Sequence, residues 1–120
     1  MRIDLHIHST ASDGTLSPLE ILTLAQDLSI AAISITDHDT LDGSKDALSF
    51  GIPPSVKFLT GVEISAEPPP PFSCAGSFHI LGYAVDIDNS ELNHTLSMLK
   101  DSRKSRNPQI LKLLYHLENE

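Results

Sequence analysis

The stretch I-D-L-H-I-H-S-T-A-S-D-G-T, from Ile3 to Thr15, decides how the rest of the chain is interpreted. Two histidines, His6 and His8, stand one residue apart in a partly apolar run that is typical of a short strand. Side chains on a strand alternate between two faces, so both imidazoles point to the same face and can hold one ion. The polar segment that follows carries Asp13 beside a glycine and favours turns. The stretch therefore predicts a strand followed by a metal-binding loop.

Length and composition limit the classes of protein to which the chain can belong. Its 120 residues, 40% of them hydrophobic and 20% charged, suffice for one soluble domain with a real core. A net charge of −8 argues against a basic surface, so we expect no stable binding to duplex nucleic acid. The single cysteine, Cys74, fits a reducing cytosol, and no apolar run is long enough for a signal core or a membrane span. We therefore expect a cytoplasmic protein without a membrane partner.

The spacing of apolar residues predicts strands and helices that alternate along most of the chain. Strands are expected at residues 1–7, 30–36, 56–64 and 77–85, and helices at residues 18–28, 42–50, 90–106 and 107–117. Ser17 and Glu20 predict a capping box at the first helix, and Ser90 is the expected cap of the third. Four consecutive prolines, Pro68–Pro71, predict a surface loop. Such alternation is typical of an α/β fold with a mainly parallel sheet, in which ligands bind at the carboxyl ends of the strands.

Later segments add candidate metal ligands at or near the ends of the predicted strands. His38 follows the second strand within T-D-H-D-T, Glu63 lies near the end of the third, and His79 lies inside the fourth. The predicted metal ligands are His6, His8, Asp13, His38, Glu63 and His79. Such a mixture of imidazole and carboxylate suits zinc, manganese or iron, and a carboxylate can bridge two ions. Asp37 and Asp39 flank His38, where each could orient a histidine or simply cap the loop.

Each candidate ligand also has an ordinary structural interpretation. His38 could hydrogen-bond a loop, Glu63 could be a solvated charge, and His79 could be a core histidine. Their joint occurrence at successive strand ends favours a metal centre over these alternatives. His94 and His116 fall on predicted helices away from this pattern, and we expect both at the surface.

Four motifs resemble those of the PHP (polymerase and histidinol phosphatase) family, and most strongly those of its stand-alone metal-dependent phosphoesterases. They are D-L-H-I-H-S-T-A-S-D-G-T at Asp4–Thr15, I-T-D-H-D-T at Ile35–Thr40, G-V-E-I-S at Gly61–Ser65 and F-H-I-L-G-Y at Phe78–Tyr83. The resemblance covers most of the chain up to Tyr83. It implies a distorted, seven-stranded β/α barrel with a trinuclear metal centre at the strand carboxyl ends. This chain would supply part of that barrel, about four mainly parallel strands with their helices.

The resemblance also implies a role for each candidate ligand. By position, His6, His8 and Glu63 would hold one ion. Glu63 would bridge to a second ion that His79 also holds, while Asp13 and His38 would hold a third. A metal-bound hydroxide would then hydrolyse phosphate mono- or diesters, most often of nucleotides or short oligonucleotides, so no side chain is assigned as the nucleophile. Histidinol phosphate is the alternative substrate.

Members of this group continue well beyond residue 120 and add another histidine and a late Asp-x-His pair to the same metals. We therefore expect residues 1–120 to form a single domain of this type that is incomplete at its C-terminal end. A non-catalytic metal-binding or interaction module is the alternative function, because those later ligands are absent from this sequence. An unclosed sheet leaves an unpaired edge, so we also expect self-association through that edge.

Overall fold

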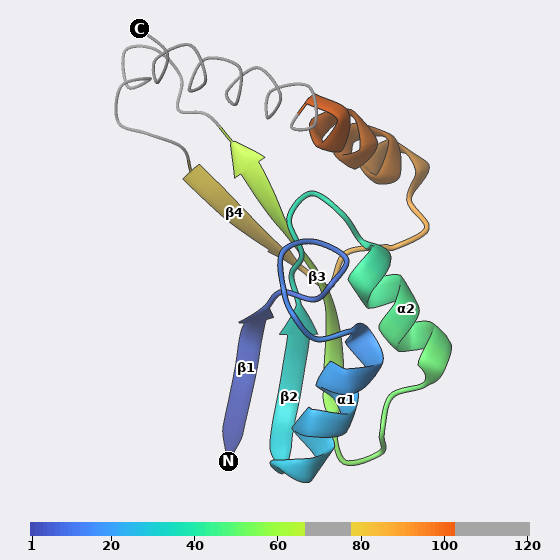
Figure 1. Ribbon diagram of the computed structural model, residues 1–120. Helices are drawn as coiled ribbons and strands as arrows, with labels where there is room; N and C mark the ends of the chain where they lie inside the picture. The colour runs from blue at the N-terminus through green and yellow to red at the C-terminus, as the bar shows by residue number, and fades with distance from the viewer. Residues whose placement is uncertain (67–77, 103–120) are drawn as a thin grey trace, which may run out of the picture.

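The computed structural model describes residues 1–66 and 78–102 and shows a curled sheet with helices packed against it (Figure 1). The strands β1 (Arg2–Ile7), β2 (Ile30–Ile35), β3 (Lys57–Ala66) and β4 (Phe78–Tyr83) are neighbours in chain order. The β1–β2 and β2–β3 pairs are parallel, and β4 pairs antiparallel with β3. The described helices are α1 (Pro18–Asp27), α2 (Asp42–Phe50) and a third helix at residues 90–102. The expected α/β partial barrel with a mainly parallel sheet is confirmed.

Several expectations fall on residues that the structure does not describe. They concern the proline run Pro68–Pro71, Cys74, the helix expected at residues 107–117 with His116, and the part of the third helix beyond Ser102. Within the described ranges, no helix is long and apolar enough to cross a bilayer.

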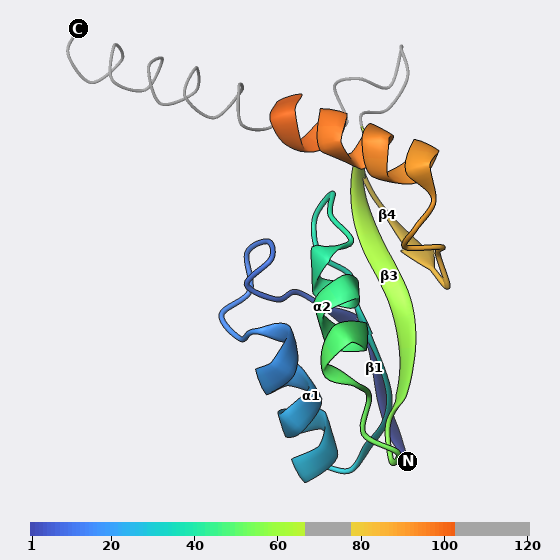
Figure 2. The ribbon, with the colours of Figure 1, turned by 90° about the vertical axis from the view of Figure 1, so that its right-hand side faces the viewer.

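Helices α1 and α2 lie on the same side of the sheet (Figure 2), and the core fills the space between them and the strands. The buried members of this core are Ile21, Leu22, Ala25, Ile33, Ile35, Ala47 and Val56. Ile33 and Ile35 point toward the helices, so the alternating Ser34 and Thr36 point to the opposite side, called here the inner face. A second cluster of Leu41, Val62 and Leu96 attaches the third helix to β3.

Local signals fix the start of α1 as the sequence predicts. The Glu20 amide donates to Ser17 Oγ at 3.2 Å, and the Ser17 amide donates to Glu20 Oε1 at 3.2 Å, which completes the capping box. The predicted cap of the third helix is wrong by one residue. Asn89 is the cap in place of Ser90, because Asn89 Oδ1 accepts a hydrogen bond from the Leu92 amide at 2.8 Å. Asparagine and serine are equally good caps, so this choice depends on where the preceding turn ends.

Strand β3 pairs with β2 on one edge along its first residues and with β4 on the other edge along its last residues. Residues 57–60 pair with β2, whereas residues 61–66 pair with β4. Glu63 therefore lies within β3 and not near its end, because the strand continues to Ala66 beside a new partner. Since β4 is antiparallel, its first residues lie beside the last residues of β3, with His79 opposite Ser65. His79 thus reaches the edge where β1 and β2 end, although it stands at the start of its own strand.

The sheet curls far enough to bring its two outer strands into contact. Tyr83, at the end of β4, donates a hydrogen bond from its hydroxyl to the Leu5 carbonyl oxygen of β1 at 2.7 Å. These two strands are separated by β2 and β3 in the sheet order. The hydrogen bond therefore spans the inner face and holds the sheet in its curved shape.

The outer edges of β1 and β4 have no further strand beside them among the described residues. Both strands expose apolar side chains, with Ile3 58% and Ile80 56% exposed. Because open apolar edges pair with other chains, we predict concentration-dependent self-association of the 120-residue chain. Ile3→Lys should shift the mass toward that of a monomer, since an edge charge opposes strand pairing.

Light scattering on fractions from size exclusion, over a range of chain concentrations, measures this equilibrium. Leu24→Lys is the matched control, because Leu24 is an exposed apolar residue on α1, away from the sheet edges. A monomeric mass for the unchanged chain at every concentration would contradict the prediction.

Candidate metal centre

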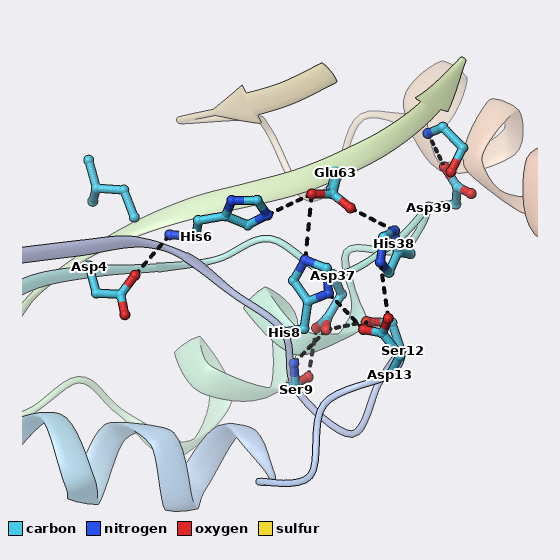
Figure 3. A network of polar contacts seen from close by, with 12 residues as sticks. Asp4, His6, His8, Ser9, Ser12, Asp13, Asp37, His38, Asp39 and Glu63 are labelled. Carbon is cyan, nitrogen blue, oxygen red and sulfur yellow. Dashed lines mark hydrogen bonds and ion pairs between the residues drawn. The ribbon is translucent and has the colours of Figure 1, made fainter. Parts of the chain in front are cut away.

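All six predicted ligands lie together on the inner face of the sheet. Figure 3 shows five of them converging from β1, from the loop that follows it, from the segment after β2, and from β3. The ligand atoms form three groups, His6–His8–Glu63, His8–Asp13–His38 and His38–Glu63–His79, and within each group they lie within 4.8 Å of one another. The groups share members, so they form one continuous cluster.

Glu63 is the central residue of this cluster, and it is only 3% exposed. Its Oε1 lies 2.6 Å from His6 Nε2 and 3.6 Å from His8 Nε2. Its Oε2 lies 2.8 Å from His38 Nδ1. The two carboxylate oxygens therefore face different imidazoles, which is the arrangement that a bridging ligand needs.

Backbone hydrogen bonds fix Glu63 beside the segment that carries His38. The Glu63 amide donates to the Asp37 carbonyl oxygen at 3.0 Å, and the Asp39 amide donates to the Glu63 carbonyl oxygen at 2.9 Å. These two bonds make a short parallel bridge between His38 and Glu63. The chain after β2 therefore runs beside β3 for one more residue pair. This pairing places the side chains of His38 and Glu63 next to each other.

Asp13 completes the other side of the cluster. Its two carboxylate oxygens lie 2.7 Å from His8 Nδ1 and 3.2 Å from His38 Nε2. The hydrogen bond from His8 lowers the pKa of the Asp13 carboxyl below its ordinary value, and the charge of His38 adds to this against an opposing effect of burial. The ionised carboxylate, which is the form that binds a cation, is therefore favoured. The loop can turn this tightly because residue 14 is a glycine. Any other residue would place its Cβ 1.9 Å from the His8 carbonyl oxygen.

Two buried nitrogens show that the cluster suits cations. His8 Nε2 and His38 Nδ1 are buried and have no hydrogen-bond partner among the described residues, although both lie near Glu63. A buried polar atom without a partner is costly. Two ligand atoms bound to one ion at about 2.1 Å lie about 3.0–3.4 Å apart. The 3.2 Å from His38 to Asp13 and the 3.6 Å from His8 to Glu63 are close to that spacing, so the residues fit divalent ions.

The two acids beside His38 hold neighbouring segments in place. Asp37 accepts hydrogen bonds from Ser9 and Ser12 of the loop, and Asp39 Oδ1 accepts one from the Ser65 amide at 3.0 Å. The sequence showed these acids but not their partners, because nothing in a turn-rich loop distinguishes a serine that binds a distant carboxylate. His94 is exposed on the third helix, as expected.

A curled, mainly parallel sheet with a cluster of imidazole and carboxylate groups on its inner face is an α/β domain with a candidate metal site. The PHP domain matches residues 4–114 of the chain. The chain belongs to the PHP family, as the sequence motifs predict.

Relatives and solved structures agree with this assignment. The chain is 32% identical over 108 residues to a 3',5'-nucleoside bisphosphate phosphatase of Chromobacterium violaceum, covering 90% of this chain and 36% of that protein. It is 34% identical over 109 residues to a 5'-3' exoribonuclease of Haemophilus influenzae, covering 91% and 38%. It resembles the structure of a Bifidobacterium adolescentis protein assigned as a metal-dependent phosphoesterase, with a TM-score of 0.78 and 26% identity, over 97% of this chain and 39% of the other. The chain therefore spans less than two fifths of the length of these proteins.

The central position of Glu63 predicts how the cluster responds to loss of its charge. Glu63→Gln keeps the size of the side chain but removes the negative charge that faces the imidazoles. We expect Mn²⁺ to bind more than about tenfold more weakly, because a ligand contributes at least as much as the outer groups that orient it. Titration calorimetry measures the affinity. Glu91→Gln, at an exposed position of the third helix, is the matched control, and equal affinities for both variants would contradict the central role.

Proposed function

We propose that the chain forms the metal-binding part of a phosphoesterase that hydrolyses phosphate mono- or diesters of nucleotides or short oligonucleotides. The observation that carries the proposal is the set of three overlapping ligand groups that meet at Glu63 and His38. The functions of the two relatives, a nucleoside bisphosphate phosphatase and an exoribonuclease, support this substrate class. They favour it over histidinol phosphate, the alternative substrate.

The proposed ligand assignment gives each ion a distinct set of side chains. One ion would take His6, His8 and Glu63, a second would take Glu63 and His79, and a third would take Asp13 and His38. We propose that the complete domain, of which this chain is a part, holds up to three divalent ions. Zinc, manganese and iron all suit mixed nitrogen and oxygen ligands, so the residues do not select among these metals.

Divalent ions held there would supply Lewis-acid stabilisation of the phosphoryl oxygens and would activate water as the nucleophile. The side chains supply position and access. Glu63 points one oxygen toward His6 and the other toward His38, so it would hold two neighbouring cations close together. The side chains of His6 and Asp13 are 53% and 64% exposed, so the cluster is open to solvent where a phosphate ester would approach. The protein is proposed to work in the cytoplasm, where its single cysteine stays reduced.

The proposal predicts manganese-dependent hydrolysis of a chromogenic phosphodiester such as bis(p-nitrophenyl) phosphate. His6→Ala removes an imidazole that lies 2.6 Å from the central carboxylate, and it should lower the rate by more than about a hundredfold. Release of nitrophenolate, followed by absorbance with and without Mn²⁺, measures the rate.

His94→Ala is the matched control for this substitution, because His94 is exposed on the third helix. It should leave the rate unchanged. Tight metal binding without turnover would support the alternative of a non-catalytic metal-binding or interaction module. Equal rates for the unchanged chain and His6→Ala would contradict the proposed centre.

A further inference from the structure

Asp37 is a buried acid beside the metal cluster that belongs to none of the three ligand groups. It is 1% exposed, and its carboxylate accepts three hydrogen bonds of 2.6 Å each (Figure 3). The donors are the Ser9 amide, the Ser9 hydroxyl and the Ser12 hydroxyl. All three donors come from the loop between β1 and α1, which lies 25 to 28 residues earlier in the sequence.

The anchored loop is the one that aims two candidate ligands. Ser9 directly follows His8, and Ser12 directly precedes Asp13. Within the loop, the amides of Ser12 and Gly14 donate to the Ser9 carbonyl oxygen at 3.0 and 2.9 Å. The Ser9 carbonyl oxygen therefore holds the turn of the loop together. Ser9 itself is fully buried against Asp37.

The surroundings of Asp37 suit an acceptor that is charged. A Cβ on Gly43 would lie 2.1 Å from Asp37 Oδ2, so the carboxylate lies against the first turn of α2. The N-cap residue of that helix, Leu41, gives no side-chain cap, and the Thr40 hydroxyl accepts a hydrogen bond from the Asp42 amide at 3.2 Å. A negative charge there is favoured by the helix dipole, and hydrogen bonds to a charged acceptor are stronger than those to a neutral one.

The backbone of Asp37 faces the other half of the cluster. Its carbonyl oxygen accepts a hydrogen bond from the Glu63 amide at 3.0 Å. The same residue therefore contacts the loop that carries Asp13 through its side chain and the strand that carries Glu63 through its main chain. A simple cap of its own loop would need neither contact.

We propose that Asp37 is a positioning residue of the metal centre. Its buried carboxylate fixes Ser9 and Ser12, so that His8 and Asp13 face His38 and Glu63. Asp37 itself binds no ion. This inference rests on the proposed metal centre and adds to it a residue whose side chain acts through the loop.

Asp37→Asn tests the proposal with little change in volume. The amide removes the charge and turns one acceptor into a donor beside Ser9. We expect Mn²⁺ to bind about tenfold more weakly, as for other groups that orient metal ligands. In the metal-free chain, the amides of Ser12 and Gly14 should exchange with deuterium faster, while the amides of β2 keep their protection. Titration calorimetry and amide exchange measured by NMR give the two readouts.

Two further variants make the result decisive. Asp46→Asn, at an exposed position of α2, is the matched control and should change neither readout. Ser12→Ala leaves the buried acid in place and removes one of its three hydrogen bonds, together with a longer contact of 3.4 Å from the Ser12 hydroxyl to Asp13 Oδ1, and it should shift both readouts in the same direction. If Asp37→Asn does not fold, Ser12→Ala decides the question alone.

The outcomes separate this inference from the proposed function. Metal affinity and loop exchange that are unchanged in both Asp37→Asn and Ser12→Ala would overturn the role of Asp37. Failure of the unchanged chain to bind Mn²⁺ would overturn the proposed centre, and with it the positioning role. Deuterium exchange of the Ser12 and Gly14 amides would then still show whether Asp37 holds the loop.

Discussion

The burial of the Glu63 carboxylate is the constraint around which the described structure is arranged. A carboxylate removed from water is costly unless cations or donors surround it. Here an imidazole from β1 approaches one oxygen, and an imidazole from the segment after β2 approaches the other. Both can reach it because parallel strands bring their carboxyl ends to the same edge of the sheet. The parallel half of the sheet is therefore what gathers the ligands.

Close contact between β2 and β3 below the cluster is equally important. A Cβ on Gly61 would lie 2.4 Å from Ser34 Oγ, so the glycine leaves room for this side chain of β2 where the pairing with β4 begins on the other edge of β3. Beyond that point, the bridge to His38 continues along the β2 edge of β3, while β4 pairs along the opposite edge. Glu63 thus has His38 beside it on one edge and Leu81 on the other, which places its side chain between the segments that carry the other ligands.

Local chemistry predicted local structure well, and distant partners account for what the sequence did not show. The Ser17–Glu20 capping box involves one turn of chain, so residue identity predicts it. The residue types and spacing of the candidate ligands likewise predicted a cluster that the fold brings together, although their assignment to particular ions stays a prediction. The direction of β4 was not predictable, because an apolar pattern reads the same in either direction. The sequence left open whether Asp37 orients a ligand or caps its loop, because its partners Ser9 and Ser12 are far away in the sequence.

The contact between His6 and Glu63 joins residues 57 positions apart. The ligand set therefore exists only after β1, β2 and β3 have assembled, and an unfolded chain cannot present it. An ion bound by the set stabilises the native state by mass action, by about 2.7 kcal/mol at a free concentration one hundred times the dissociation constant. The folded fraction of the chain would then rise and fall with the supply of free metal, which couples the lifetime of the protein to the metal content of its surroundings.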